Sequence, residues 1–329
     1  MNTERILICE KEVFEMGKKR IKKKQKQKII RSAVTLGIII IAALLSLILK
    51  PWQNSGSSNL GDGRDLNPSD LQVHYIDVGQ ADAILIRIPS EEGQKNMLID
   101  AGSPLRQSSK DKITTDYLAD LGVDTLHYMI ITHPHFDHAS AAAEVIEAVN
   151  VENLILPECE ATQAFWVDMF EAMEAKNLEY IPSEIGDTYQ IGEASFEILG
   201  PADLSLGEDN PNNYSVVVRL DYGETSFLFT GDAEVESEEA MLKAQPSSKF
   251  KCDVLKVGHH GAANATSAAL LAAAKPSLAI IQCGADNEYG HPTQLILNRL
   301  ADANIPVLRT DLEGTIIICS DKKEVYPAK

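Results

Sequence analysis

Cysteine is scarce in this sequence, and basic residues are scarce over most of it. Only five of the 329 residues are cysteine, an odd number without a C-x-x-C pair, which argues against a disulfide framework and a cysteine zinc site. Cys252, Cys283 and Cys319 lie in or beside apolar runs and are expected to be buried free thiols. After residue 50 the chain has 18 Lys or Arg against 44 Asp or Glu, a net charge of −26. Such a surface repels phosphate backbones, so tight electrostatic binding of duplex DNA is not expected without metal ions or a partner.

The first 50 residues have the opposite charge balance. Residues 18–31 contain nine Lys or Arg, and residues 32–49 follow without a charge. This uncharged run is just long enough for a helix that crosses a bilayer, which takes about 20 residues, and basic residues mark the cytoplasmic side of such helices. The sequence predicts a basic cytoplasmic tail (1–31) and a single-pass anchor in the cell membrane (32–49), with everything that follows outside. A cleaved signal peptide is the alternative, but no A-x-A-like site of small residues follows the run.

One folded domain is expected over 71–329, joined to the anchor by a flexible linker over 50–70 that is rich in Asn, Ser, Gly and Asp. Within this domain, apolar runs typical of strands alternate with segments of helical spacing. Strands are predicted at 71–78, 83–88, 96–100, 126–131, 215–220, 226–230, 253–257, 278–282, 306–309 and 315–319. Helices are predicted at 109–121, 139–148, 234–243, 266–274 and 293–302. Two strand-rich halves, each with helices, predict an α/β sandwich in which two sheets face each other and helices lie outside.

The densest group of metal-ligating residue types is the loop His133-Pro134-His135-Phe136-Asp137-His138. Three imidazoles and a carboxylate fall within six positions, directly after the predicted strand 126–131. The strand delivers this loop at its carboxyl end, and a regular turn would not let all four side chains face the same way. Histidine and aspartate in such density suit a borderline divalent ion, chiefly Zn²⁺.

Two later strands end in the same residue types. One of them stops at Gly231-Asp232, where the aspartate is either a helix cap or a ligand that bridges two cations. Beside a His/Asp loop we favour the bridging ligand. Another strand stops at Gly258 and the pair His259-His260. Adjacent histidines point in different directions, so we expect one to bind an ion and the other to face a substrate.

Other polar residues near strand ends are weaker signals. Asp100 is expected to hydrogen-bond the histidine loop and fix its rings rather than to bind an ion. The segment Asn287-Glu288-Tyr289-Gly290-His291 is typical of a turn before a proline-started helix. His74 and His127 stand in apolar strands without partners and are expected in the core or at a sheet edge.

Together these segments resemble the metallo-β-lactamase superfamily. In addition, the segments 77–82, 98–102, 255–261, 287–292 and 309–316 resemble, in this order, the metallo-hydrolase domain of the ComEC competence proteins, the channel proteins of bacterial DNA uptake. The resemblance covers about residues 71–320. It implies the metallo-β-lactamase-like αβ/βα four-layer sandwich. The long multi-helix channel part has no counterpart, so we expect a free-standing, membrane-anchored form.

The resemblance also implies roles for individual residues. His133 and His135 would hold one ion, and Asp137 and His138 would hold the other. Asp232 would bridge the two ions and His260 would complete the second site, while His259 would face the substrate. The catalytic residues implied are Asp137, Asp232 and His259. The residues that would support the site or contact the substrate are Asp77, Asp100, Asn213, Ser215, Lys256, Asn287 and His291.

One departure from the family pattern bears on metal binding. Superfamily members with two full sites have a further histidine between the loop and the bridging aspartate, but this chain has none from 139 to 258. The segment Asn212-Asn213-Tyr214-Ser215 occupies that part of the chain and offers only amide and hydroxyl oxygens. We therefore predict one tight and one weaker Zn²⁺ site, with Mn²⁺ able to replace Zn²⁺ in the weaker one. A second departure, Ala262 in place of the usual Ser after His-His-Gly, bears on the substrate.

The predicted function is hydrolysis of phosphodiesters, as a nuclease or phosphodiesterase, by a metal-bound hydroxide. Two other classes stay open. One is a hydrolase of another ester or lactam bond. The other is a DNA-uptake accessory module that has lost its chemistry, although binding without catalysis would need a basic groove. The expected partners are a nucleic-acid or other phosphodiester substrate, the membrane and the DNA-uptake machinery, and the sequence makes no prediction of the oligomeric state.

Overall fold

The structure is a computed structural model and describes residues 63–103 and 113–329. The predicted tail (1–31), the anchor (32–49) and most of the linker (50–70) lie outside these residues. Among the helices of the described ranges, none has the length and apolar character needed to cross a membrane.

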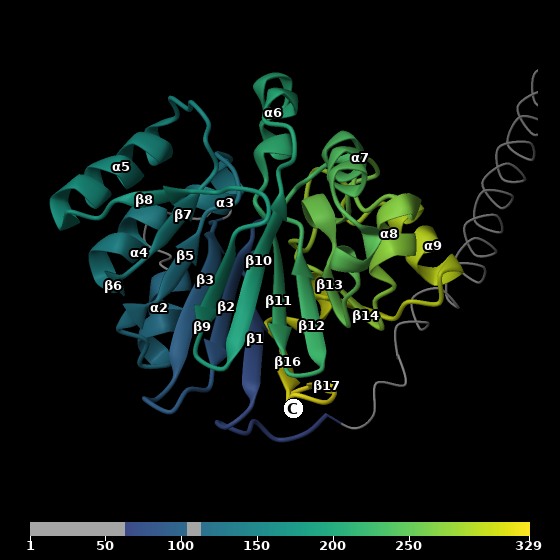
Figure 1. The fold of residues 1–329 in the computed structure, drawn as a ribbon, viewed down its shortest axis with the longest axis horizontal. Coiled ribbons are helices and arrows are strands. Elements are labelled where there is room, and N and C mark those ends of the chain that lie inside the picture. Colours follow the sequence, from purple (N-terminus) through teal and green to yellow (C-terminus); the bar gives the residue numbers. More distant parts are fainter. Residues whose placement is uncertain (1–62, 104–112) are drawn as a thin grey trace, which may run out of the picture. The chain divides into compact units, whose positions relative to one another are not determined.

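Two sheets form the centre of the domain (Figure 1). The first has the order β17-β16-β1-β2-β3-β5-β7-β8, with bounds Val325–Pro327, Ile316–Ser320, Leu71–Tyr75, Ala83–Ile88, Lys95–Ala101, Tyr128–Ile130, Leu154–Leu156 and Tyr180–Pro182. The second has the order β15-β14-β13-β12-β11-β10-β9, with bounds Val307–Arg309, Leu278–Ile281, Val254–Lys256, Thr225–Phe229, Val217–Tyr222, Ala194–Gly200 and Thr188–Ile191. A short pair, β4 (Thr125–Leu126) and β6 (Asn150–Val151), stands apart.

Helices cover the outer face of each sheet. The first sheet packs on α2 (Ile113–Asp120), α4 (Ala142–Ala148) and α5 (Ala164–Lys176), and the second on α7 (Val235–Ala244), α8 (Ala268–Ala274) and α9 (Gln294–Asp302). Three short helices lie in loops: α3 (Phe136–Ala139), α6 (Ser205–Asp209) and α10 (Thr310–Glu313). One buried apolar cluster fills the space between the sheets, and one lies under each helical layer. The predicted αβ/βα four-layer sandwich is confirmed.

Strand direction brings the polar strand ends together. β3 pairs with β5 in parallel, and β12, β13 and β14 are also parallel neighbours. The loops that follow parallel strands emerge at the same edge of a sheet. The histidine loop therefore leaves the first sheet beside the end of β3, and the loops after β12 and β13 leave the second sheet side by side.

Some boundaries differ from the prediction. The expected strand 71–78 ends at Tyr75, and the expected helix 139–148 begins only at Ala142, in α4, because Ala139 ends the preceding turn α3. Residues 63–70 fall within the predicted linker, yet Arg64 pairs with the C-terminal segment through backbone hydrogen bonds to Pro327 and Lys329. Its guanidinium also lies over the ring of Tyr326, 4.4 Å from the centroid. The described part of the domain therefore begins before residue 71.

The cysteine prediction is confirmed, but the isolated-histidine prediction is only partly right. His74 is buried as expected yet contacts Tyr117 and Gln72, and His127 lies in a bend between β4 and β5 instead of in a strand. Cys252, Cys283 and Cys319 are buried free thiols. His74 is 1% exposed in β1, and the ring of the half-buried His127 accepts a hydrogen bond from the Asn96 amide.

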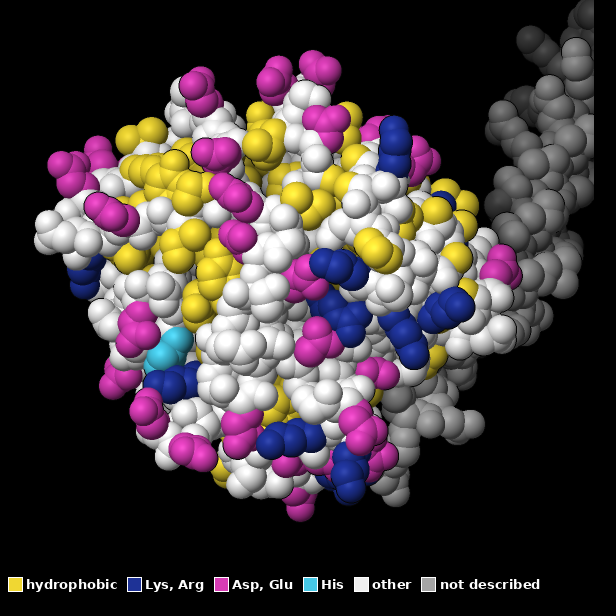
Figure 2. All heavy atoms as spheres, viewed as in Figure 1, with side chains coloured by type: hydrophobic (Ala, Val, Ile, Leu, Met, Phe, Trp, Pro, Cys, Tyr) yellow, Lys and Arg dark blue, Asp and Glu magenta, His cyan; other side chains and the backbone are white. Residues whose placement is uncertain are grey.

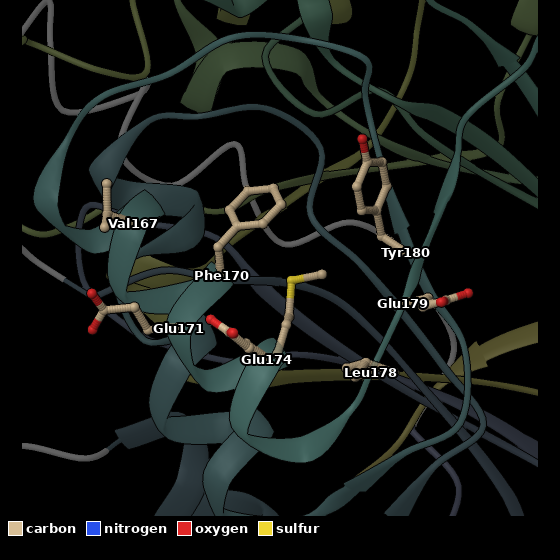
Figure 3. Close-up of a pocket in the computed structure, with 8 residues that line it drawn as sticks. Val167, Phe170, Glu171, Glu174, Leu178, Glu179 and Tyr180 are labelled. Atoms are coloured by element: carbon tan, nitrogen blue, oxygen red, sulfur yellow. The ribbon is translucent and has the colours of Figure 1, made fainter.

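An apolar groove lies on the outside of the first sheet, between α5 and the edge strand β8 (Figure 3). Val167, Phe170 and Tyr180 line it and are 44%, 38% and 39% exposed. Glu171, Glu174 and Glu179 line it as well. Figure 2 shows hydrophobic side chains gathered over this part of the surface, with carboxylates among them. None of the predicted site residues lines this groove.

Candidate metal centre

Side chains from both sheets converge at one point between the strand ends. Asp232, after β12, places Oδ2 3.2 Å from Nε2 of His138 and 3.7 Å from Nε2 of His260. Oδ2 of Asp137 lies 3.3 Å from the same nitrogen of His260. Ligand atoms of His133, His138 and Asp232 lie within 4.8 Å of one another, and so do those of Asp137, His138 and His260. These two groups share the ring of His138 and form one cluster.

The conformation of the histidine loop explains how residues so close in sequence face the same point. His133 and His135 lie in a bend, where the His135 N–H donates to the His133 carbonyl oxygen at 3.0 Å and Nε2 of the first ring lies 3.1 Å from Nδ1 of the second. Asp137 and His138 instead lie in the single turn of α3. We expected no regular turn here; the short helix brings His138 beside His133, with 4.2 Å between ring centroids, and places Asp137 against His260 of the second sheet. A Cβ at Gly102 would stand 1.7 Å from the Asp137 carbonyl oxygen, so only glycine fits beside the turn.

Asp100 supports the loop from the end of β3, as the sequence predicted it would. Its Oδ1 accepts a hydrogen bond from the Thr132 backbone N–H at 2.7 Å. Its Oδ2 accepts from the Thr132 hydroxyl at 2.9 Å and lies 2.8 Å from Nδ1 of His138. With its Nδ1 bonded to Asp100, His138 directs Nε2 towards Asp232. Such carboxylate–histidine pairs set the tautomer and orientation of metal-ligating rings.

A buried ion pair lies below the cluster. Nζ of Lys256 is 2.5 Å from Oδ2 of Asp82, and both residues are 1% exposed. Oδ1 of Asp82 lies 3.3 Å from Nδ1 of His260, which is also 3.0 Å from the Gln282 carbonyl oxygen. Lys256 does not contact the surface where a substrate would bind, because strand alternation turns it inward with Val254. Our sequence reasoning did not select Asp82.

His259 lies at the open side of the cluster. It is 23% exposed at its side chain, and its Nε2 is 3.7 Å from Oδ2 of Asp232. Its Nδ1 is 3.4 Å from Oε1 of Glu234, which accepts a hydrogen bond from Nδ2 of Asn212 at 2.8 Å. His259 and His260 both have positive φ, 49° and 52°. This backbone directs the two rings apart, one inward and one outward.

The side chains of Asn213 and Ser215 each accept a hydrogen bond from a backbone N–H beside the cluster. Oδ1 of Asn213 accepts from the Glu234 N–H at 3.2 Å. Oγ of Ser215 accepts from the Asp232 N–H at 2.9 Å and lies 3.4 Å from Nδ1 of His133. Both residues therefore position the aspartate segment.

The remaining predicted residues lie further out. Asp77 is exposed and closes a turn by accepting from the Gly79 N–H at 3.1 Å, so it does not join the cluster. Asn287 holds a turn together by bonding the carbonyl oxygens of Gly284 and His291 and the N–H of the latter. The ring of His291 packs edge-on against that of His259, with 5.6 Å between centroids. His291 is thus brought to the rim of the cluster.

Three buried carboxylates, those of Asp82, Asp100 and Asp232, determine the electrostatics. Burial lowers the pKa of His138, but the negative charges of Asp232 and Asp100 outweigh burial and raise this pKa well above the usual histidine value. For His260 burial is likewise outweighed, here by Asp232 and Asp82, and the pKa rises to about 10. The site is therefore strongly attractive to positive charge.

The pKa values of His133 and His135 shift in the opposite direction. Burial, reinforced by the neighbouring His138, lowers the pKa of His133 well below its usual value. Burial also lowers the pKa of His135. These two rings are neutral at pH 7, whereas a cation that binds His138 and His260 would have to displace a proton from each ring.

The cluster fits a divalent metal ion. Nε2 of His138, Nε2 of His260 and Oδ1 of Asp232 are buried and make no hydrogen bond within the described residues. Unpaired buried polar atoms are costly, and a cation between them would satisfy all three. Imidazole nitrogens with carboxylate oxygens are the donor set of zinc sites and also suit manganese.

The fold and this His/Asp cluster define a class of proteins, the metallo-β-lactamase-type metal-dependent hydrolases. The family profile described as the metallo-beta-lactamase superfamily matches residues 76–285, and the chain belongs to this superfamily. The YhfI protein of Bacillus subtilis, described as a metallo-beta-lactamase fold protein, superposes with a TM-score of 0.50 at 11% identity. The match covers 76% of this chain and 100% of that chain, and it shows a shared fold.

Within the superfamily, this chain is similar to proteins named for competence and recombination. ComE operon protein 3 of Bacillus subtilis is 32% identical over 260 residues, which are 75% of this chain and 33% of that protein. Recombination protein 2 of Haemophilus influenzae is 30% identical over 269 residues, 81% of this chain and 31% of that protein. Competence protein ComA of Neisseria gonorrhoeae is 34% identical over 128 residues, 39% of this chain and 18% of that protein. The chain thus spans about a third of the length of the first two relatives.

Proposed function

We propose that this protein is a metal-dependent phosphodiesterase or nuclease. The observation that carries the proposal is the convergence of Asp137, His138, Asp232 and His260 on one point, with unpaired donor atoms directed at it. The names of the relatives, which refer to competence and recombination, support a nucleic-acid substrate. Divalent ions held at this point would lower the pKa of a coordinated water towards about 7 and offset charge on phosphoryl oxygens.

The protein's own residues have distinct tasks in this proposal. Asp100 and Asp82 keep the ligand rings of His138 and His260 oriented from the far side. His259 faces the open side of the cluster, where it would contact the substrate. Oε1 of Glu234 lies 3.4 Å from Nδ1 of that ring, without a hydrogen bond between them. Nε2 lies on the side of Asp232, 3.7 Å from its Oδ2, and we propose that it donates a proton to the leaving oxygen.

Two unequal metal sites follow from the donor set. Asp137, His138, Asp232 and His260 provide a carboxylate-rich site with two imidazoles, which we propose binds Zn²⁺ tightly. His133 and His135 lack a third imidazole, and the side-chain oxygens of Asn213 and Ser215 are engaged elsewhere. We propose that this second site is weaker and accepts Mn²⁺.

We also propose a location for the hydrolase domain, outside the cell membrane. Residues 32–49 are uncharged and follow a segment with nine basic residues in 18–31, which supports a single-pass anchor with the hydrolase domain outside the cell membrane. A reporter enzyme that folds only outside the cytoplasm, fused after residue 62, tests this. Activity of the fusion is expected, and an inactive but expressed fusion contradicts the location. Interaction with the DNA-uptake machinery would follow from the same placement.

The enzymatic proposal is tested with the purified full-length protein and Zn²⁺ or Mn²⁺. Single-stranded DNA and bis-p-nitrophenyl phosphate are the substrates, and Asp232→Asn is the matched inactive variant. We expect cleavage by the wild type and none by the variant. Turnover of a chromogenic lactam or ester without cleavage of DNA would favour the alternative hydrolase class. A metal-loaded protein that retards DNA but does not cut it would favour the accessory module.

A further inference from the structure

An exposed tyrosine lies next to the cluster and has no role in the chemistry above. Tyr289 is 58% exposed, and its ring stacks on that of His291 with 5.8 Å between centroids and 26° between planes. The ring of His291 in turn packs edge-on against that of His259, at 5.6 Å and 73°. A continuous series of three rings therefore runs from the open side of the metal centre to solvent.

The turn that carries this tyrosine is held by hydrogen bonds. The side chain of Asn287 bonds three backbone groups across the turn, with donor–acceptor distances of 2.9, 2.5 and 3.0 Å. The Gly284 N–H donates to Oε1 of Gln80 at 3.0 Å, which ties the turn to the first sheet. Gly290 has φ +70° and open space on its Cβ side. The backbone that carries the aromatic ring is thus held beside the centre.

The charges around the turn decide what such a ring can recognise. Asp286 and Glu288 are exposed on the same turn, and the chain as a whole has a net charge of −18. These carboxylates repel phosphate groups, so affinity for a nucleic acid cannot come from a basic groove here. Stacking of an unpaired base on an aromatic side chain needs no positive charge.

We infer that Tyr289, backed by His291, is a stacking platform for an unpaired nucleobase next to the phosphate that occupies the metal centre. This inference rests on the proposed phosphodiesterase function and specifies its substrate as single-stranded nucleic acid. Stacked bases in a duplex present no free face to such a ring, so the platform selects single strands.

The test measures binding separately from cleavage. The probe is a fluorescent phosphorothioate-linked oligothymidylate, which resists hydrolysis and keeps the backbone charge, and its binding to the full-length protein is followed by fluorescence anisotropy with Mn²⁺. Stacking on aromatic residues contributes about 1–3 kcal/mol per base. We therefore expect Tyr289→Leu to weaken binding roughly 5- to 150-fold, and Tyr289→Phe to bind like the wild type. Tyr180→Leu, which removes the exposed tyrosine of the α5–β8 groove, is the control and should leave binding unchanged.

A second arm uses probes with abasic positions. Each should bind the wild type weakly and be insensitive to Tyr289→Leu, because the ring then has no base to stack on. Equal binding of the oligothymidylate to wild type and Tyr289→Leu, or no binding to the wild type, would overturn the inference. Cleavage of ordinary single-stranded DNA is assayed in parallel. If Tyr289→Leu cleaves DNA with an unchanged KM, the stacking platform is rejected and the phosphodiesterase function is retained. If the protein shows base-dependent binding without any cleavage, the phosphodiesterase function is rejected.

Discussion

Nζ of Lys256 lies 2.5 Å from Oδ2 of Asp82, and both side chains are 1% exposed. The negative charge of Asp82 offsets the burial of the ammonium and raises the Lys256 pKa, while Lys256 together with His260 holds the pKa of Asp82 below its usual value against burial. Both groups are therefore charged in the folded protein. The other carboxylate oxygen of Asp82 contacts His260, so the pair connects the interior of the sandwich to the metal centre.

Removal of Lys256 should lower the free energy of unfolding and weaken metal binding. Lys256→Met leaves Asp82 buried without its counter-charge, and breaking a buried pair costs about 3–5 kcal/mol. Urea unfolding of the full-length protein measures this loss. Lys249→Met is the matched control, because Lys249 pairs with Glu197 at the surface with 39% of its side chain exposed and should cost less than about 1 kcal/mol. Equal losses in the two variants would refute the role of the buried pair.

Asp100 should control metal affinity without being a ligand. In Asp100→Asn one carboxylate oxygen becomes an amide that donates, yet the Thr132 N–H, the Thr132 hydroxyl and Nδ1 of His138 all need an acceptor. Loss of such a partner typically lowers metal affinity about 10- to 100-fold. Competition with a chromogenic chelator measures the affinity, and Asp77→Asn, an exposed aspartate in a turn, should keep it. Unchanged affinity in Asp100→Asn would show that the hydrogen bonds do not orient the ring.

The ends of the strands could be predicted from the sequence because apolar runs stop where polar residues begin. This pattern located Asp100, Asp232 and His260, and the parallel order of the strands brings them together. Asp82 precedes a strand instead of following one, so the same pattern passed over it. Because side chains alternate along a strand, Lys256 faces the same side of the sheet as Val254 and the opposite side from Leu255. The direction of the lysine can be predicted only once the inner face of the sheet is known.

Contacts between distant loops could not be predicted in this way. The ring contacts of His291 with Tyr289 and His259 depend on where the turn after β14 lies relative to the turn after β13. The sequence gives only the residue types of each turn. Likewise, the helical turn α3 inside the histidine loop depends on the close approach of Gly102 to the Asp137 carbonyl oxygen, which is a tertiary contact.

The two proposed metal sites should separate on dialysis. We expect the protein to retain roughly one ion per chain after dialysis against metal-free buffer, because only one site combines two carboxylates with two imidazoles. His260→Ala should lose the retained ion, and His135→Ala should keep it, since His135 belongs to the weaker pair. Elemental analysis gives the metal content. Two ions retained with equal affinity, or an ion retained in His260→Ala, would contradict the assignment.

His74 should make the stability of the domain depend on pH independently of the metal centre. Its ring is buried in β1, with Nδ1 2.8 Å from the Tyr117 hydroxyl and Nε2 3.2 Å from Oε1 of Gln72. Burial, with the positive charge of Arg87, lowers its pKa from 6.5 to about 4. The unfolded chain therefore binds a proton between these values while the folded domain does not, so stability falls as the pH drops from 6.5 towards 4 and is fully present above 6.5.

The size of this effect follows from the same shift. It amounts to about 2 kcal/mol at pH 5 and approaches about 3 kcal/mol below pH 4. We expect the difference in the free energy of unfolding between pH 7.5 and pH 5, measured in urea, to be smaller in His74→Phe than in the wild type by about 2 kcal/mol. The variant loses two hydrogen bonds at both pH values, so its absolute stability is not the readout. A pH dependence identical to that of the wild type would mean that the His74 ring takes up its proton equally in the folded and unfolded chain, contrary to its burial between the strand and α2.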